Sequence, residues 1–359
     1  MKGAPKVLYF GTYERSYPRN AQVISCLRRA GVDVVERHVD AWGGAEHKWR
    51  AGVGTAARLA LAEARLLRRP RDAFDVVLVG YPGHLDLPGA RRAARGRPVV
   101  FNPLVSLADT LVEDRGRFRR GSPPARLLAG IDRFALRAAD LVVADTAAHA
   151  EYLAALGGLA PARVAVCLVG AEERVFRPCW APEQPFTALF VGKLIPLHGV
   201  ETILAAARIA PELRLRIVGS GQLDRLLGDA AASVESIPWV EYERLPGELA
   251  RAGCALGIFG RSAKASRVIP NKAFQALACG TPLVTGDTRA ARELLVDGES
   301  ALLVPPGDPA ALAAALRRIA ADPDLAARLG EGGRAAYAAR ASEDVLGRRW
   351  RGLIEDLVR

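Results

Sequence analysis

The sequence lacks the marks of a secreted, metal-binding or membrane-spanning protein. Its 359 residues include five cysteines without a Cys-x-x-Cys pair and five histidines without a His-Glu-x-x-His motif. No apolar run approaches the ~20 residues of a transmembrane helix. The chain starts with a strand-like run rather than the apolar core and cleavage site of a signal peptide. We therefore expect mostly buried, reduced thiols, no zinc site and a cytoplasmic location.

Acidic residues are scarce in the first half of the chain. Residues 1–170 hold 26 Lys+Arg against 16 Asp+Glu, a balance of +10, whereas residues 171–359 hold 24 against 23, a balance of +1. This charge favours an anionic partner, such as a lipid surface or a phosphorylated acceptor. Arginine on solvated faces of an Ala- and Arg-rich sequence explains it equally well. Basic strands with base-stacking aromatics are lacking, so we do not expect nucleic acid as the partner.

Short apolar runs rich in Val, Leu and Ile predict the strands. Most runs are continuous rather than alternating, as in parallel strands buried on both faces. Ala/Leu/Arg-rich segments with helical spacing lie between them, for example 20–30, 55–69 and 199–210. The alternation predicts an α/β protein built from two doubly wound, Rossmann-like domains. The expected strands fall within 6–11, 32–39, 75–80, 97–102, 140–146, 163–170, 187–192, 213–219, 254–260, 281–287 and 300–306.

A proline-rich segment marks the domain boundary. We predict a first domain over 1–170, a linker over 171–186 and a second domain over 187–338. The tail, 339–359, reads as an amphipathic helix that packs back toward the first domain. Because ligands of open α/β sheets bind at the carboxyl ends of the strands, we expect a central cleft that both domains face.

Glycines and cations follow several predicted strands. Gly11 ends the first strand and could let a ligand approach the backbone, although an ordinary turn explains it as well. Gly192 and Lys193 end the first strand of the second domain, and His198 precedes its helix. Lys193 could neutralise a phosphate and His198 could add a donor. An exposed lysine and a turn histidine are the plainer alternatives.

A second glycine turn shares this sheet edge. The strand over 213–219 ends in Gly219-Ser220-Gly221, and we expect a helix to follow. Backbone N–H groups at such a turn suit an anion or a ribose, although a lone Gly-x-Gly is weak evidence.

The most specific stretch is "GRSAKASRVIPNKAFQALACGTPLVTGD", residues 260–287. Asn271 is expected to N-cap a helix that ends at Gly280. The N–H groups at the helix start, with Arg267 and Lys272 nearby, predict a diphosphate site. Gln275, one turn into the helix, can hydrogen-bond a hydroxyl but carries no charge. The plainer alternative is a basic loop before a packing helix.

These motifs carry a family resemblance. "FVGKLIPLHGVETILAAA", "LRIVGSGQLDRLL" and "VIPNKAFQALACGTPLVTGD", with the residues that follow, resemble the second domain of retaining nucleotide-sugar glycosyltransferases. The resemblance is to the group 1, family-4 type with GT-B architecture and covers roughly residues 187–320. The first half fits by architecture alone.

The resemblance implies a nucleoside-diphosphate sugar as the donor, with UDP or GDP as the nucleotide and no further cofactor. It implies that Lys193 and His198 contact the diphosphate, with histidine where lysine is usual. The family's paired glutamates fall on Arg267 and Gln275, so both acids are missing. Glutamine can still bind ribose hydroxyls, whereas Arg267 is better suited to the diphosphate. The base contacts fall on Trp239 and Val240.

The chemistry that follows needs no metal. Lys193, Arg267 and the helix start at Asn271 stabilise the leaving diphosphate in place of a cation. The resemblance implies attack from the leaving-group side, without a protein nucleophile. Asp109 is the best acid to orient an acceptor hydroxyl, although an N-cap or loop role is equally plausible.

The acceptor is expected to be a glycan, including one carried on a polyprenyl diphosphate, as in surface-polysaccharide assembly. A basic helix over 49–71, with Arg91, Arg92, Arg95 and Arg97, could rest on anionic lipid at the inner face of the plasma membrane. Solvated helices are the alternative. Two other functions stay open: a nucleotide-sugar epimerase of the same fold, and a non-catalytic nucleotide-sugar binding protein.

Overall fold

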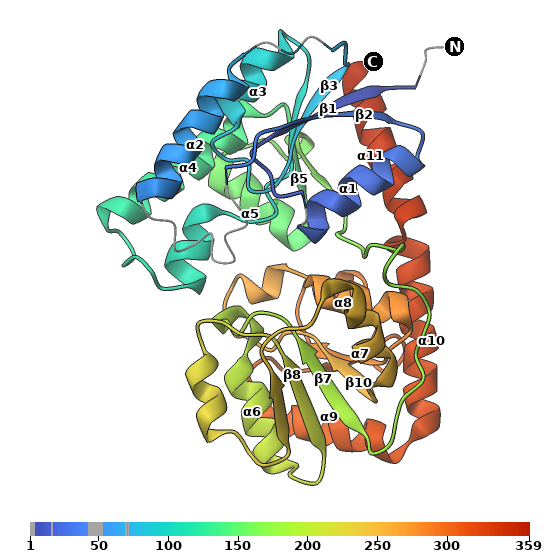
Figure 1. Ribbon diagram of the computed structural model, residues 1–359. Helices are drawn as coiled ribbons and strands as arrows, with labels where there is room; N and C mark the ends of the chain where they lie inside the picture. The colour runs from blue at the N-terminus through green and yellow to red at the C-terminus, as the bar shows by residue number, and fades with distance from the viewer. Residues whose placement is uncertain (1–3, 16, 42–52, 69, 71) are drawn as a thin grey trace. The chain divides into compact units, whose positions relative to one another are not determined.

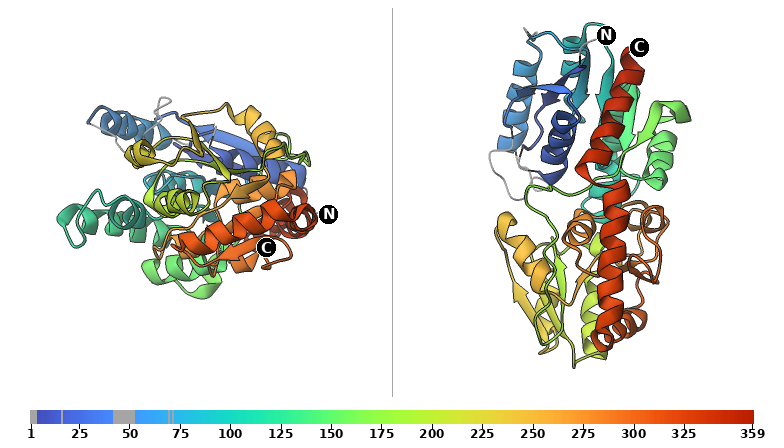
Figure 2. Two further views of the ribbon diagram at one scale, coloured as in Figure 1. Left: turned by 90° about the horizontal axis from the view of Figure 1, so that it is seen from below. Right: turned by 90° about the vertical axis from the view of Figure 1, so that its right-hand side faces the viewer.

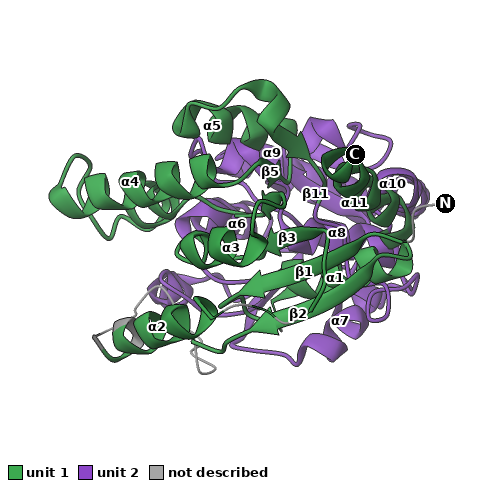
Figure 3. Ribbon diagram, turned by 90° about the horizontal axis from the view of Figure 1, so that it is seen from above, with its two compact units in different colours: residues 1–168, 343–359 green, residues 169–342 purple. Residues whose placement is uncertain are grey.

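The structure is a computed structural model that describes residues 4–15, 17–41, 53–68, 70 and 72–359 (Figure 1). Strands and helices alternate along the chain. The chain forms two compact units: the first unit contains residues 1–168 and 343–359, and the second contains residues 169–342 (Figure 3). Within the described residues, no helix is long and apolar enough to cross a membrane.

The first unit contains a six-stranded parallel sheet in the order β2-β1-β3-β4-β5-β6. Its central strands read as continuous apolar runs because both faces are covered, and every residue of β3 and β5 is buried. The strands are β1 (Lys6–Gly11), β2 (Asp33–His38), β3 (Val76–Val79), β4 (Val99–Phe101), β5 (Leu141–Ala144) and β6 (Val164–Val166). The helices are α1 (Pro18–Arg29), α2 (Val53–Leu66), α3 (Leu87–Ala94), α4 (Pro123–Ala138), α5 (Ala147–Gly157) and α11 (Glu343–Val358), with a π-helical turn η2 (Asp109–Asp114) and a 3-10 turn η3 (Pro161–Arg163).

The second unit has its own six-stranded parallel sheet, in the order β12-β11-β10-β7-β8-β9. The strands are β7 (Thr187–Val191), β8 (Arg214–Val218), β9 (Val234–Ile237), β10 (Cys254–Leu256), β11 (Leu283–Gly286) and β12 (Leu302–Val304). The helices are α6 (Val200–Ile209), α7 (Leu245–Arg251), α8 (Asn271–Cys279), α9 (Pro309–Ala321) and α10 (Pro323–Arg340), with 3-10 turns η4 (Pro196–His198), η5 (Asp224–Asp229), η6 (Tyr242–Arg244), η7 (Ala265–Arg267) and η8 (Ala291–Glu293). The chain order reverses between β7 and β10, which is where such sheets bind ligands.

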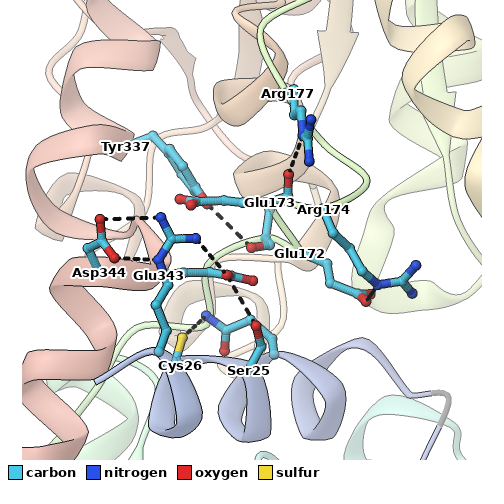
Figure 4. Close-up of polar contacts among 12 residues, drawn as sticks. Ser25, Cys26, Glu172, Glu173, Arg174, Arg177, Tyr337, Glu343 and Asp344 are labelled. Carbon is cyan, nitrogen blue, oxygen red and sulfur yellow. Dashed lines mark hydrogen bonds and ion pairs between the residues drawn. The ribbon is translucent and has the colours of Figure 1, made fainter. Parts of the chain in front are cut away.

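The last helix completes the first unit by packing on α1 (Figure 2). Trp350 of α11 is fully buried, with the Arg19 guanidinium 5.9 Å from its ring centroid. Gly347 allows the close approach, since a Cβ there would lie 2.6 Å from the Cys26 carbonyl oxygen. The Ser25 hydroxyl donates to the Glu343 carboxylate at 3.1 Å (Figure 4). Burial of the tryptophan therefore fixes the tail to this unit.

The prediction of two parallel α/β sheets is confirmed, and the expected strands match the observed ones closely. Strand β9 was not among them, because the exposed Glu235 and Ser236 at its centre interrupt the apolar run. The segment 171–186, predicted as a linker, has neither helix nor strand and belongs to the second unit. There the Trp180 indole N–H donates to the Ala252 carbonyl oxygen at 2.9 Å. Four of the five cysteines are buried, and all five are free.

Candidate functional site

The first feature of the site is Gly192, directly after β7 at the point where the strand order of the second sheet reverses. Its φ of 141° is a conformation that favours glycine. A Cβ there would lie 2.8 Å from Lys272 Nζ and 3.4 Å from His198 Cε1. Glycine at this position therefore leaves room for two nitrogen-bearing side chains at the end of β7.

Lys272, from the first turn of α8, is the most unusual of these side chains. It is only 9% exposed, and its Nζ lies 3.6 Å from the centroid of the Phe190 ring. Within the described residues, Nζ has no hydrogen-bond partner. Burial lowers the pKa of Lys272 well below the ordinary lysine value. Because buried amino groups are normally hydrogen-bonded, an unsatisfied one at a ligand-binding edge marks a candidate anion site.

His198 organises the loop after β7. Its Nδ1 lies 2.5 Å from the Lys193 carbonyl oxygen. Since a carbonyl oxygen only accepts, Nδ1 carries the proton. The ring meets the Phe190 ring edge-on, with centroids 5.6 Å apart. His198 therefore holds the backbone of Lys193, whose side chain is exposed.

Gly219 and Gly221 pack the loop after β8 against the loop after β7. A Cβ on Gly219 would lie 2.1 Å from the Gly192 carbonyl oxygen, and one on Gly221 would lie 2.6 Å from the Leu194 carbonyl oxygen. The N–H groups of both glycines, which the sequence suggested as anion or ribose donors, have partners within the protein. The Gly219 N–H donates to Ile237, at 2.8 Å, and the Gly221 N–H to Asp224 Oδ1, at 2.6 Å. The helix expected next is the 3-10 turn η5 instead.

Helix α8 begins one residue earlier than expected. Asn271 is its first residue, Pro270 holds the N-cap position, and no side chain caps the helix. The prediction of an Asn271 cap is therefore wrong, because the extended Pro270 already sets the helix entry. Gly280 ends the helix in the left-handed conformation, as predicted. Arg267 ends the 3-10 turn η7 before α8 and is half-buried.

Gln275 lies one turn into α8 and near Tyr242, which no sequence motif marks. Burial raises the pKa of Tyr242; the nearby Glu172 carboxylate raises it further, and the Gln275 amide acts in the opposite direction. Glu172 is 7% exposed and pairs with the Arg174 guanidinium (Figure 4). The Phe176 ring packs edge-on against Tyr242, with centroids 5.4 Å apart. Tyr242 therefore lies near both the glutamine and a carboxylate from a distant part of the sequence.

The remaining predicted donor contacts, Trp239 and Val240, follow β9. Trp239 is 67% exposed, although large aromatic side chains are usually well buried. Val240 is half-buried. An exposed indole at the carboxyl edge of the sheet offers a flat surface for a base.

Two predicted residues belong to the first unit. Gly11 has a φ of 131°, and a Cβ there would lie 2.0 Å from Asp86 Oδ2. The Asp86 carboxylate accepts from the Thr12 N–H at 2.8 Å, so packing against Asp86 explains the glycine without a ligand. Asp109 is the first residue of η2, is 8% exposed and is not an N-cap. Capping falls to Asp132, which accepts from two backbone N–H groups at 2.8 and 2.9 Å.

These features define a two-unit α/β protein with a candidate anion site in its second sheet. Residues 185–322 match the family model for "Glycosyl transferases group 1", and residues 8–170 match the model for "Glycosyl transferase 4-like domain". D-inositol 3-phosphate glycosyltransferase 1 of Catenulispora acidiphila is 30% identical over 72% of this chain and 67% of its own length. The chain belongs to the group 1, family-4 type glycosyltransferases.

Solved structures show the same fold. Sucrose-phosphate synthase from Thermosynechococcus elongatus has a TM-score of 0.76 at 19% identity, covering 99% of both chains. Anabaena HepE in complex with UDP-glucose has a TM-score of 0.70 at 16% identity, covering 98% of this chain and 99% of that one. Both support the GT-B fold. The chain spans about half the length of several curated relatives. One is a D-inositol 3-phosphate glycosyltransferase of Thermomonospora curvata, which is 30% identical to this chain. The match covers 54% of this chain and 52% of that relative.

Proposed function

We propose that this protein transfers a hexose from a UDP- or GDP-sugar to a glycan acceptor, with retention and without a metal ion. The observation that carries the proposal is the buried amino group of Lys272 beside Gly192 and His198, without a hydrogen-bond partner within the described residues. A diphosphate oxygen would supply the missing partner. The complex of HepE with UDP-glucose supports a uridine donor.

The chemical task of such a site is to stabilise the charge of the leaving diphosphate. Lys272 binds as the ammonium form, since an adjacent anion favours that form. Lys193 and Arg267 are proposed to add charge from the loop after β7 and from η7. Gln275, with Tyr242 and Glu172 beside it, is proposed to hold the ribose, and Trp239 with Val240 the base. No protein nucleophile is assigned.

The acceptor is proposed to be anionic. The excess positive charge in residues 1–170 supports a phosphorylated or polyprenyl-diphosphate-linked glycan, handled at the cytoplasmic face of a membrane in polysaccharide biosynthesis. The relatives named for inositol 3-phosphate also point to phosphorylated acceptors. Asp109 is proposed to orient the acceptor hydroxyl.

Two assays test the proposal. In a thermal-shift panel of UDP, GDP and their sugars, one nucleotide class should raise the melting temperature of the protein, because only the folded protein binds the nucleotide. Release of nucleoside diphosphate should then require both donor sugar and acceptor. Isomerised donor without released nucleotide would indicate an epimerase. A shift without turnover would indicate a binding protein, and no shift with any nucleotide would contradict the donor site.

Metal independence gives a separate prediction. Nucleotide release should be unchanged when EDTA is added, because cationic side chains stabilise the leaving group. The measurement is the initial rate in EDTA against the rate in excess Mg²⁺. A loss of most of the activity in EDTA that Mg²⁺ restores would show that a cation is needed.

Glu172 gives a second prediction. Glu172→Gln should weaken UDP or GDP binding about 3–10-fold, the net worth of one hydrogen bond to the ribose. The 2′,3′-dideoxy nucleotide, which lacks both hydroxyls, should bind the variant and the wild type equally. Glu173→Gln is the matched control, since the Glu173 carboxylate accepts from the Tyr337 hydroxyl at 3.2 Å (Figure 4). If the variant loses the same affinity for the ordinary and the dideoxy nucleotide, Glu172 does not bind the ribose hydroxyls.

A further inference from the structure

The first unit has an apolar hollow on its surface, beside the segment that follows β3. It has a volume of about 500 Å³ and lies between the start of α3 and the outer side of α4. Three large apolar side chains on its walls are strongly exposed: Leu127 by 65%, Phe134 by 54% and Leu85 by 42%. Clustered exposed apolar side chains of this size mark a binding surface more often than scattered single ones do.

Helix α4 has two apolar faces. Ala125, Ala135 and Leu136 are buried and pack the helix on its own unit. Leu127, Ile131 and Phe134 form a second stripe, at spacings of four and three residues, that lines the hollow. The core uses the first face, whereas Leu127 and Phe134 of the second stripe stay exposed. Figure 3 shows α3 between α2 and α4 in one helical layer.

Arginines are frequent in α4 and in the segment before it. Residues 115–137 hold seven arginines and one acid, Asp132, which is buried and bonded to Ser106. Six of these arginines are exposed; Arg137 donates to the Gly157 carbonyl oxygen at 2.8 Å, and Arg126 lies on the wall of the hollow. The only acid just before them with an exposed side chain, Glu113, pairs with Arg120. The five exposed arginines other than Arg137 are Arg117, Arg119, Arg120, Arg126 and Arg133.

Three of the four arginines between positions 91 and 97 have partners within the protein, and the fourth, Arg95, is exposed. Arg91 pairs with Asp140 at 2.8 Å, Arg92 donates to the Leu67 carbonyl oxygen at 3.1 Å, and the Arg97 guanidinium lies 5.1 Å from the Phe74 ring centroid. Residues 49–52, 69 and 71 of the predicted basic helix lie outside the described residues. The α4 surface, defined by Leu127, Phe134 and the five exposed arginines, is therefore the stronger candidate for a lipid contact.

We infer that the α4 surface docks on an anionic lipid bilayer, with Leu127 and Phe134 in the acyl boundary and a hydrocarbon chain in the hollow. The inference deepens the proposed lipid-linked acceptor by naming the surface that meets the membrane. Exposed apolar side chains on a helix that also carries exposed arginines fit an anionic interface. A second copy of the chain fits poorly, because a two-fold contact would bring the two sets of arginines together.

Vesicle sedimentation of the full chain tests the inference. The wild type should bind phosphatidylcholine vesicles that contain phosphatidylglycerol, and this binding should be lost in high salt. It should not bind vesicles of pure phosphatidylcholine. Leu127→Ser with Phe134→Ser should lower the partition coefficient roughly tenfold. Arg126→Gln with Arg133→Gln should also lower it. Ile209→Ser with Val296→Ser, at exposed apolar positions of the second unit, is the control and should bind like the wild type.

The replaced residues are exposed, so the variants should keep the wild-type melting temperature and nucleotide binding. A loss of vesicle binding with normal nucleotide binding therefore distinguishes a failure of the lipid surface from a failure of the donor site. Unchanged vesicle binding in both variants, or equal binding to both kinds of vesicle, would overturn the inference. So would a wild-type dimer in lipid-free solution that the serine variant makes monomeric, because a second copy would then occupy the surface.

Discussion

Replacing Lys272 with methionine is expected to raise the melting temperature of the free protein while greatly weakening donor binding. Methionine keeps the unbranched apolar stem that packs over Phe190 but removes an amino group that is buried without a hydrogen-bond partner within the described residues. Removing such a group should stabilise the fold by about 1–2 kcal/mol. For a unit of this size that corresponds to roughly 2–8 °C.

Donor binding should change in the opposite direction. Losing a charge-assisted hydrogen bond to phosphate in a buried site should weaken UDP or GDP binding roughly 10–100-fold. Lys6→Met is the control, because it also removes one lysine, but at an exposed site in the first unit where Lys6 pairs with Asp33 at 3.1 Å. It should change neither quantity appreciably. A Lys272→Met variant of lowered stability and unchanged affinity would show that the lysine is structural.

The same lysine makes donor affinity depend on pH. Burial lowers the pKa of Lys272 in the free protein, and a bound diphosphate raises it again, so binding takes up a proton. Affinity should be highest below the free-protein pKa. The donor affinity should fall as pH rises from the Lys272 pKa of the free protein to the Lys272 pKa of the complex, by up to about tenfold per pH unit. Lys272→Met should remove this dependence, and its gain in stability should be largest at low pH, where the lysine of the unfolded chain is charged.

Gly219→Ala is expected to have the largest effect on stability. The residue has a φ of 137°, which is nearly closed to side chains, and an added Cβ would lie 2.1 Å from the Gly192 carbonyl oxygen. A backbone atom cannot rotate away as a side chain can, so the two loops would have to separate. We expect a loss of about 3–5 kcal/mol, from backbone strain and overpacking together. Because the loop of Gly192 would move, donor binding should be lost as well.

Gly228→Ala is the matched control for this variant. Gly228 lies in η5, has no left-handed φ, and has nothing within 4 Å of an added Cβ. Its free energy of unfolding should stay within about 0.5 kcal/mol of the wild type. Chemical denaturation of both variants checks the prediction. Equal stability of the two would contradict the close packing of the loops after β7 and β8.

The strands of both units could be predicted because buried parallel strands are continuous apolar runs, a signal that survives in a single sequence. Strand β9 shows the limit, since Glu235 and Ser236 are exposed and interrupt the run. The 3-10 turn η5 shows another, because the sequence after Gly221 has helical composition but does not form an α-helix. The local sequence pattern therefore predicts a helix or a strand correctly only where the residues of that element are buried.

The candidate site was only partly predictable. The glycines and cations after the strands stand out in the sequence, but the burial of Lys272 depends on Gly192 and Phe190, some eighty residues earlier in the chain. The meeting of Glu172 and Gln275 at Tyr242 has the same origin, since the two lie about a hundred residues apart. Such contacts arise from the fold and leave no local motif. The Asn271 cap failed because Pro270 occupies the position that a capping side chain needs.

The proposal that Lys272 binds the donor diphosphate is tested most directly by titrating wild type and Lys272→Met with a nucleoside and its diphosphate. Isothermal calorimetry with uridine and UDP, or with guanosine and GDP if thermal shift selects that base, measures the four affinities. We predict that the diphosphate binds the wild type far more tightly than the nucleoside does. In Lys272→Met most of that difference should disappear, while nucleoside binding stays unchanged. A variant that keeps the full preference for the diphosphate would contradict the proposed role of Lys272.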